Sequence, residues 1–195
     1  MYKYRRLALF MVFFVGFALG FSLQEEEPVM ESEPEVVEFT PEPITEVEVV
    51  AVYNVPLDSD LQLHIFDLCV EKRIDPTIII GQIYTESSYN AEAVGDGGDS
   101  LGLMQVQPKW NKERMEELNC TDLLDPYQNV TVGIDILAEL IDHYDGNVEK
   151  ALVAYNAGQT GAYNMYFSKG VYSSDYSKSV LAMAELLNSS ENFLN

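Results

Sequence analysis

The composition of residues 24–56 argues against a hydrophobic core there, and this confines a globular fold to the rest of the chain. The stretch holds ten Glu and five Pro but no Lys or Arg. Like charges repel one another and prolines interrupt helices, so this composition is typical of a disordered linker. We therefore expect one folded domain over residues 57–195, long enough to bury about two thirds of the surface of its unfolded chain.

The chain begins with a basic cluster and an apolar run. Lys3, Arg5 and Arg6 precede residues 7–23, an apolar run interrupted only by two glycines and a serine. Its length is at the lower limit for a membrane span and slightly beyond a signal-peptide core. Positive charge on its amino side predicts export of the chain after residue 23. We expect residues 1–23 to be a transmembrane anchor or signal segment. The domain would then lie outside the cytoplasm, single-pass in the cell membrane or secreted if the segment is cleaved.

The charge balance excludes several classes of protein. The chain carries 32 acidic against 11 basic side chains, a formal net charge of −21. Nucleic-acid binding needs clustered Lys and Arg, so we expect no nucleic-acid partner.

Two His and two Cys are too few for a zinc ribbon, and we expect no metal and no cofactor. Export of Cys69 and Cys120 leaves both a disulfide and two buried thiols open.

From residue 57 onward the pattern is that of a mainly α domain. Asp-Pro pairs at residues 75–76 and 125–126 are typical of a helix N-cap followed by proline in the first turn. Apolar residues recur at spacings of four, three and four from Val130 and again from Tyr176, as on an amphipathic helix. We predict helices over residues 58–73, 76–87, 109–118, 126–144, 147–157, 160–168 and 174–188, with a short β element around 100–107.

A glycine-rich loop interrupts this helical pattern. Residues 94–102 read Val-Gly-Asp-Gly-Gly-Asp-Ser-Leu-Gly. Glycine lets a backbone take positive φ and lets a ligand approach closely. A loop of this kind inside a compact domain is more often functional than not.

Glu86 is the residue on which we place the chemistry. It lies at the end of the predicted helix 76–87, after the apolar residues Ile79, Ile80 and Ile83. Partial desolvation and the negative end of the helix dipole would both raise its pKa. A carboxylic acid that stays protonated near neutral pH can protonate a leaving oxygen.

Three ordered motifs extend this interpretation. Residues 86–87 read Glu-Ser, residues 102–105 Gly-Leu-Met-Gln and residues 154–158 Ala-Tyr-Asn-Ala-Gly. Together they resemble the motifs of the soluble lytic transglycosylase family, which is related to goose-type lysozyme. The resemblance covers about residues 62–182. It implies a lysozyme-like (α+β) single domain with the glycine-rich loop or short β element beside the site.

The resemblance also implies an activity and a set of site residues. Glu86 would be the single acid and base that cleaves the β-1,4 bond between N-acetylmuramic acid and N-acetylglucosamine in peptidoglycan, leaving 1,6-anhydromuramic ends. Tyr155 would hydrogen-bond to Glu86, and Tyr176 would orient it. The expected substrate-binding residues are Ser87, Ser100, Met104, Gln105, Tyr155, Asn156 and Tyr176.

Several of these residues have a plainer interpretation. Met104 could be an ordinary core residue, and a tyrosine within a helix is more often core with a satisfied hydroxyl. Trp110 could stack on a sugar, but we expect it to anchor its own helix. The loop departs from the family pattern near Gly95 and Gly98, and we expect Ser100 to supply the hydroxyl that the departure removes. Asn129 starts an N-glycosylation pattern, but inside a predicted helix.

Two other functions compete with the transglycosylase. A hydrolytic lysozyme usually needs a second carboxylate, which Asp96 or Asp99 could supply. A tethered module that binds glycan or docks an envelope assembly would need no active site at all. The acidic domain would be repelled by anionic wall polymers. We therefore expect it to act on glycan strands where its membrane segment places it, with an envelope-spanning machine as a candidate partner.

Overall fold

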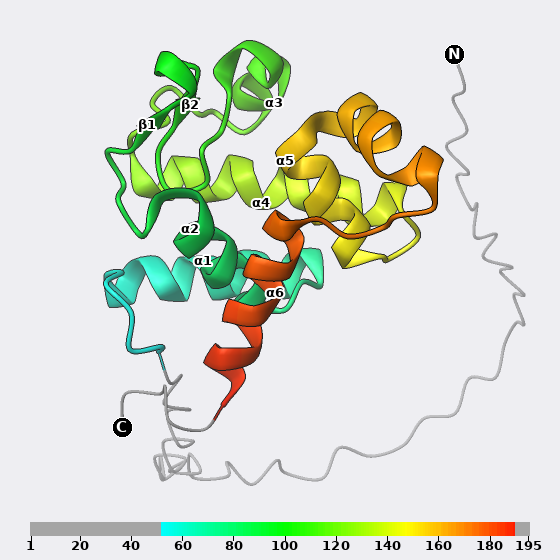
Figure 1. Cartoon of the computed structure of the whole chain (residues 1–195). Helices are drawn as coiled ribbons and strands as arrows, with labels where there is room; N and C mark the ends of the chain where they lie inside the picture. Colours follow the sequence, from blue (N-terminus) through cyan, green and yellow to red (C-terminus); the bar gives the residue numbers. More distant parts are fainter. Residues whose placement is uncertain (1–51, 190–195) are drawn as a thin grey trace, which may run out of the picture. The chain divides into compact units, whose positions relative to one another are not determined.

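The computed structural model describes residues 52–189, which form one mainly helical unit with a small sheet (Figure 1). The predicted segment 1–23 and most of the predicted linker 24–56 lie outside these residues. Within residues 52–189, no helix is both long and apolar enough to cross a membrane. The α-helices and strands are α1 (Ser59–Lys72), α2 (Pro76–Ser87), β1 (Val94–Gly95), β2 (Ser100–Leu101), α3 (Lys112–Glu117), α4 (Pro126–His143), α5 (Val148–Met165) and α6 (Asp175–Asn188).

Local sequence signals set the starts of the main helices. The Asp75 carboxylate accepts a hydrogen bond from the backbone N–H of Thr77, and Asp125 does the same for Gln128. Ser174 caps α6 through a reciprocal pair of bonds with Ser177. These caps satisfy backbone donors that a helix start leaves unpaired. The predicted helices 58–73, 76–87, 126–144 and 174–188 are therefore confirmed to within a residue or so.

One predicted helix differs from the structure, and a predicted helix break is present. The helix predicted over 109–118 is a 3₁₀ turn, Pro108–Trp110, followed by α3. Asn111 separates them, because its side chain donates to the Gln107 carbonyl and its backbone N–H to that of Pro108. The helices predicted over 147–157 and 160–168 are confirmed as the two parts of α5, which meet at Gly158, where φ of 69° and ψ of 154° are not helical. Positive φ at this glycine turns the chain without a loop.

The predicted β element is confirmed as a small antiparallel sheet. Val94 pairs with Leu101 and Gly95 with Ser100, and a single further bridge joins Leu101 to Val106. The 3₁₀ turn Asp96–Gly98 connects β1 and β2. The glycine-rich loop is therefore a hairpin whose second strand is also bridged to the segment after it.

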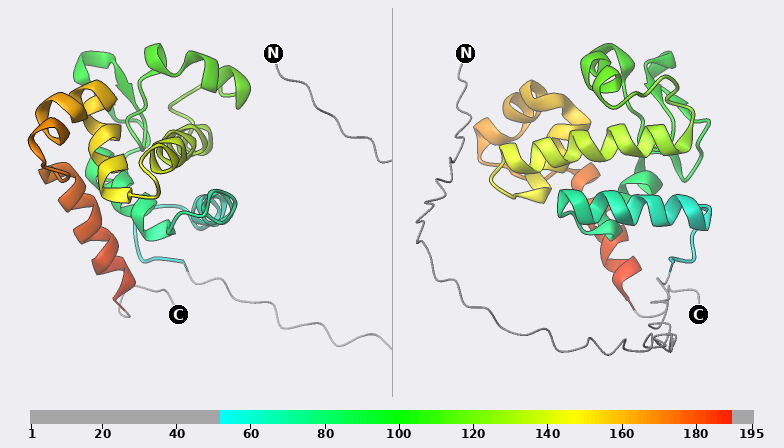
Figure 2. Two further views of the ribbon diagram at one scale, coloured as in Figure 1. Left: turned by 90° about the vertical axis from the view of Figure 1, so that its right-hand side faces the viewer. Right: turned by 180° about the vertical axis from the view of Figure 1, so that it is seen from behind.

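Helix α4 is the centre of the core. Its buried side chains include Val130, Ile134 and Leu137, none of them exposed to solvent. Figure 2 shows α1 and α4 lying side by side, and α4 also packs against α5. The core closes around this helix because its apolar stripe faces both neighbours.

Helix α6 packs along α2 and completes the unit. Gly81 of α2 lies directly against the backbone of α6. At its far end Asn188 donates a hydrogen bond to the hydroxyl of Thr77 (Nδ2–Oγ1 3.2 Å). This pairing brings the amino end of α6 to the carboxyl end of α2, where Glu86 lies.

Two further details concern the ends and the cysteines. Tyr53 is buried against Ile80 and Leu187, and its backbone N–H donates to Gln62 Oε1 at 2.8 Å. The folded part therefore includes residues that composition assigned to the linker.

Cys69 and Cys120 are both buried free thiols. Of the two alternatives that the sequence left open, a disulfide or two buried thiols, the structure has the buried thiols.

Candidate active site

A cleft of about 870 Å³ opens between the hairpin loop, α3 and the kink of α5. Glu86 lies on its wall, at the last turn of α2. The cleft is lined by Glu86, Asp96, Ser100, Gln105, Val106, Gln107, Trp110, Asn111, Arg114, Ile136, Glu139, Leu140, Ala154, Tyr155, Asn156, Ala157, Gly158, Gln159, Thr160 and Gly161.

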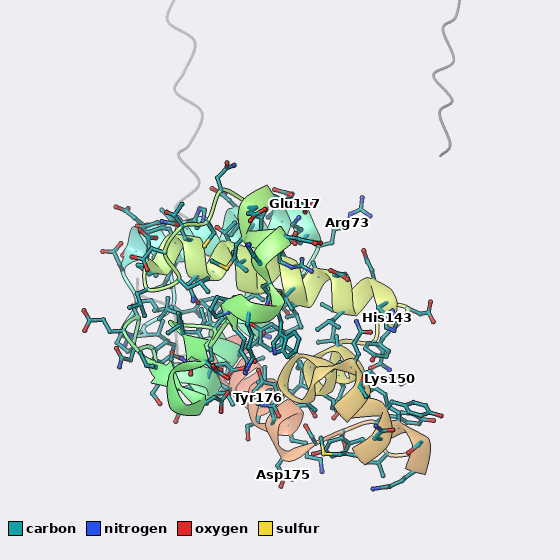
Figure 3. The ribbon with its side chains drawn as sticks, turned by 90° about the horizontal axis from the view of Figure 1, so that it is seen from above. Arg73, Glu117, His143, Lys150, Asp175 and Tyr176 are labelled. Atoms are coloured by element: carbon teal, nitrogen blue, oxygen red, sulfur yellow. The ribbon has the colours of Figure 1, made fainter. Side chains whose placement is uncertain are left out.

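Tyr176 holds the Glu86 carboxylate. Its hydroxyl donates a hydrogen bond of 2.6 Å to Glu86 Oε1. Tyr176 belongs to the first turn of α6 and lies between the hairpin region and α5 in the view from above, whereas its neighbour Asp175 lies at the outer edge (Figure 3). Residues 90 positions apart therefore meet because α6 packs on α2.

Burial makes Glu86 a weak acid. Desolvation raises the pKa of Glu86 from 4.5 to about 7. The hydrogen bond from Tyr176 lowers this pKa, and the negative charge of Asp96 raises it. The upward shift anticipated from the sequence is present, and burial is its main cause. At neutral pH a large fraction of Glu86 therefore carries a proton that it can donate.

Tyr155 does not bond to Glu86, which corrects the role expected from the sequence. Its hydroxyl donates to the backbone carbonyl of Met104 at 2.9 Å. The physical reason is that Met104 lies in a turn outside the β ladder, so its buried carbonyl needs a partner. Burial and the nearby charge of Glu86 raise the pKa of Tyr155 well above 10, which keeps it a neutral donor.

Met104 and Gln105 brace the loop. The Met104 side chain is fully buried and packs over Gly133, so this side chain is part of the core and not of the cleft wall. Gln105 does line the cleft, but its Nε2 donates to the carbonyls of Ala93 (3.2 Å) and Gly102 (2.9 Å). Its amide nitrogen is thus used to fix the loop, and the sugar contact expected of Gln105 stays a prediction.

Asp96 and Asp99 lie in different surroundings. Asp96 lines the cleft and accepts hydrogen bonds from Ser100 Oγ (2.6 Å) and Gln107 Nε2 (3.1 Å). Asp99 forms an ion pair with Lys109 and does not line the cleft. Of the two candidates for a second carboxylate, only Asp96 therefore faces the cleft that holds Glu86.

The remaining predicted residues divide between the cleft and the helix surface. Asn156 is exposed on the cleft wall. Ser87 donates to the Ile83 carbonyl at 3.1 Å and does not line the cleft, since its position on α2 turns it back along the helix.

Trp110 is 76% exposed and lines the cleft, so the expectation that it anchors its own helix is wrong. It sits in a short 3₁₀ turn that buries none of its residues.

Asn129 is a residue that sequence reasoning missed. It is fully buried; its Oδ1 accepts from the Met104 N–H, and its Nδ2 donates to the carbonyls of Leu101 and Leu123, all at 2.8 Å. One side chain thus fixes the Gly-Leu-Met-Gln turn to α4. The available signal was a polar residue on the apolar side of a predicted helix, beside Val130.

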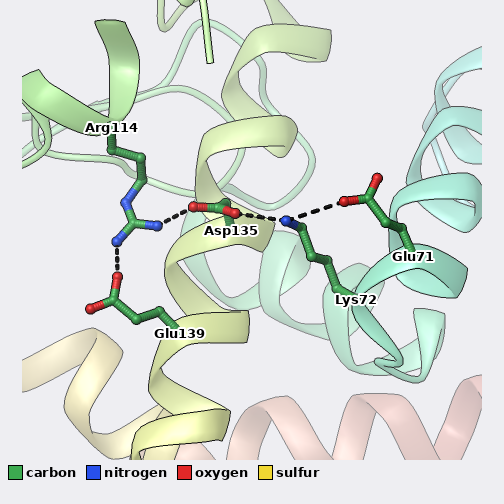
Figure 4. A network of polar contacts seen from close by, with 5 residues as sticks. All are labelled: Glu71, Lys72, Arg114, Asp135 and Glu139. Carbon is green, nitrogen blue, oxygen red and sulfur yellow. Dashed lines mark hydrogen bonds and ion pairs between the residues drawn. The ribbon is translucent and has the colours of Figure 1, made fainter. Parts of the chain in front are cut away.

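An ion-pair network borders the cleft through two of its residues, Arg114 and Glu139. Arg114 contacts both Asp135 and Glu139, and Lys72 bonds Asp135 at 2.9 Å and Glu71 at 3.3 Å (Figure 4). Arg114 and Glu139 line the cleft and also a neighbouring depression of about 770 Å³. Within residues 52–189, no group of three or more His, Cys, Asp or Glu side chains is placed to hold a metal ion.

Comparison with known proteins gives consistent matches. Residues 65–170 match the family model described as "Transglycosylase SLT domain". Over 89 residues the chain is 38% identical to the "Transglycosylase" of Enterobacteria phage PRD1, a match that covers 46% of this chain and 31% of the relative. The chain thus spans about a third of that relative's length.

Solved structures show the same fold. An inactive mutant of the lytic transglycosylase Slt from Pseudomonas aeruginosa superposes with a TM-score of 0.54 at 19% identity, over 69% of this chain and 26% of that one. The 70 kDa soluble lytic transglycosylase of Escherichia coli gives 0.56 at 21% identity, over 66% and 24%. At these identities the likeness concerns the fold alone.

Proposed function

Because the chain belongs to the transglycosylase SLT domain family, we propose that it is a peptidoglycan lytic transglycosylase with Glu86 as its single acid and base. The observation that carries the proposal is the state of Glu86. It lies on the wall of a cleft, has a pKa of about 7 and is held by the hydroxyl of Tyr176. Such a group can both donate a proton and take one back near neutral pH.

The proposed reaction has two steps at one carboxyl group. Protonated Glu86 gives its proton to the glycosidic oxygen as the bond from that oxygen to C1 of N-acetylmuramic acid breaks. The resulting carboxylate then removes the proton of the C6 hydroxyl, whose oxygen forms a bond to C1 of the same sugar. The products are a 1,6-anhydromuramic end and a new hydroxyl on N-acetylglucosamine. No water is consumed, and Glu86 ends protonated as it began.

An intramolecular nucleophile suits the surroundings of Glu86. The attacking hydroxyl is part of the bound sugar, so it needs no separate site on the protein. Tyr176 supports the first step, since its hydrogen bond stabilises the carboxylate that this step forms. The exposed face of Trp110 and the side chain of Asn156 are available on the cleft wall to hold the sugar chain.

A second candidate is a hydrolytic lysozyme that uses Asp96. The observation in its favour is that Asp96 lines the same cleft and its charge raises the pKa of Glu86. Against it, one oxygen of Asp96 already accepts hydrogen bonds from Ser100 and Gln107. That oxygen is therefore less free to activate water.

Product mass separates these candidates. Muropeptides from purified peptidoglycan should carry anhydromuramic ends, each one water lighter than the hydrolytic product. Glu86→Gln should remove nearly all activity, by a factor of about 10² or more. Reducing ends alone would indicate the lysozyme, and binding without any cleavage would indicate a tethered glycan-binding module.

We also propose that residues 1–23 place the enzyme at the membrane, where it opens the wall locally. The basis is the sequence of this segment and the acidic charge of the chain. A chain without residues 1–23, exported by another route, should keep its activity on isolated peptidoglycan but lose its function in cells. Equal performance in cells would overturn this part of the proposal.

A further inference from the structure

Gln82 is a fully buried polar side chain with unused hydrogen-bonding atoms. Its exposed fraction is 0%, and neither its amide nitrogen nor its amide oxygen makes a hydrogen bond of regular geometry within residues 52–189. Burying an amide without a partner destabilises a fold, and an apolar side chain of similar shape would remove that penalty. A role in packing alone therefore does not account for glutamine at this position.

The position of Gln82 relates it to the acid. It lies on α2 four residues before Glu86, and side chains at this spacing share one face of a helix. Across from this face is α6, which carries Tyr176 in its first turn. Tyr176 in turn donates its only hydroxyl proton to Glu86.

The amide of Gln82 acts on the Tyr176 hydroxyl. Burial and the charge of Glu86 raise the pKa of Tyr176 well above 10, whereas the Gln82 amide lowers it. A neighbour that lowers the pKa of a phenol stabilises negative charge on its oxygen, as the N–H of an amide does. Gln82 therefore lies beside the Tyr176 hydroxyl, the same group that donates to the Glu86 carboxylate.

We propose that Gln82 is a positioning residue that holds the Tyr176 hydroxyl ready for both protonation states of Glu86. The inference rests on the proposed function, in which Glu86 alternates between acid and carboxylate. An amide carries both a donor and an acceptor. With Glu86 ionised, the N–H of Gln82 supports a hydroxyl that donates to the carboxylate. When Glu86 is protonated, it donates a hydrogen bond to the Tyr176 oxygen. The Tyr176 O–H then points away from Glu86, and the amide oxygen of Gln82 can accept a hydrogen bond from it.

The first test replaces the amide by an apolar group of similar length, Gln82→Met, in the full chain. We expect unchanged or higher thermal stability, little change in KM and a fall in kcat of about fivefold, the rate equivalent of one neutral hydrogen bond. The midpoint of Glu86 titration, followed by the NMR shift of its side-chain carboxyl carbon, should rise by about half a pH unit because the carboxylate loses support. An unmoved titration midpoint would overturn the proposal.

A matched control separates this role from packing. Gln62 is also fully buried, but its amide bonds the backbone of Tyr53 and Leu57. Gln62→Met should therefore lower stability and leave the titration of Glu86 unchanged. Gln82→Leu serves as a second variant if the methionine packs poorly, with the same expected rise in the titration midpoint.

A double-mutant comparison identifies the route of the effect. In a Tyr176→Phe background the hydroxyl is absent, so Gln82→Met should produce no further shift of the Glu86 titration. An equal shift with and without the hydroxyl would show that Gln82 does not act through Tyr176, and would overturn the proposal. Because the NMR measurement needs no turnover, failure of this inference is distinguishable from absence of transglycosylase activity.

Discussion

Gly81 lies against Val180 so closely that a Cβ atom on the glycine would be 2.8 Å from the Val180 carbonyl oxygen. The backbone nitrogen of Ala184 would be only 3.2 Å from the same Cβ. Helices α2 and α6 are therefore in backbone contact at this point. This contact sets the distance between the helix that carries Glu86 and the helix that carries Tyr176.

The first prediction concerns this contact. Gly81→Ala should push α6 away from α2, because the obstructing atoms belong to the backbone and cannot rotate aside. We expect a loss of about 1–3 kcal/mol in the free energy of unfolding and at least a tenfold fall in activity as Tyr176 leaves Glu86. Urea unfolding and turnover of purified peptidoglycan measure the two effects.

Gly161→Ala is the control for stability. Its Cβ would make only ordinary contacts at 3.4 Å, with Ala157 and Met165. Alanine is also the better helix former, so stability should be unchanged or slightly higher. If Gly81→Ala were equally harmless, the close approach of the two helices would not limit the site.

The second prediction is a pH-dependent gain in stability for Glu86→Gln. An unfolded Glu loses its proton near pH 4.5, but folded Glu86 keeps it until about pH 7. Between these values the folded state binds more protons, so its stability falls as pH rises, and the penalty is complete above pH 7. Glutamine resembles the protonated acid and carries no such penalty.

Glu86→Gln should therefore match the wild type in stability at pH 4 and exceed it by up to about 3 kcal/mol at pH 8. Urea unfolding of both proteins at the two pH values measures this. A difference in stability that does not vary with pH would show that the carboxylate is not desolvated in the fold.

The third prediction concerns Asn129, which joins α4 to the turn at residues 101–104. Asn129→Leu removes three hydrogen bonds and leaves the Met104 N–H and the Leu123 carbonyl without a partner, whereas the Leu101 carbonyl keeps its bond from the Val106 N–H. We expect a loss of about 2–4 kcal/mol in the free energy of unfolding. Asn188→Ala is a suitable control, because that exposed side chain makes one bond of 3.2 Å to Thr77 and should change stability by less than about 1 kcal/mol.

The parts of the fold that were predictable from sequence depend on short-range rules. Asp75 and its following proline start α2, and the helix then runs to Ser87, so the position of Glu86 at a helix end comes from residues within one segment. The apolar stripe of α4 that begins at Val130 is likewise set by the spacing of residues within one helix. The pKa shift of Glu86 was also predictable, because desolvation by a neighbouring apolar face needs no knowledge of a specific partner.

The parts that were not predictable depend on long-range choices between similar groups. Two tyrosines were candidates to hold Glu86, and which hydroxyl reaches it is decided by the packing of α6 on α2 and by the need of the Met104 carbonyl for a donor. Trp110 is exposed although its type favours burial, because it lies in a short 3₁₀ turn that buries none of its residues. The composition of residues 24–56 also gave no sign that Tyr53 is buried, because its burial depends on contacts with Ile80 and Leu187, which are distant in the sequence.

The fourth prediction uses the thiols. Burial raises the pKa of Cys69 to about 12, so the reactive thiolate is almost absent at neutral pH. A maleimide should label neither Cys69 nor Cys120 rapidly in the native state, and should label both after unfolding without reductant, because both are free. Mass spectrometry counts the labels. Two unlabelled cysteines in the unfolded chain would show that they pair.

The last prediction changes the charge next to the acid while keeping its shape. Asp96 raises the pKa of Glu86, so Asp96→Asn should lower that pKa and move the alkaline limb of the activity profile to lower pH. The shift is opposite in sign to the one expected for Gln82→Met, and the two together identify Glu86 as the group that titrates. A transglycosylase should keep its anhydro product and most of its rate at the new optimum. A hydrolase that activates water through Asp96 would lose about 10² or more of its rate at every pH, which would contradict the proposed mechanism.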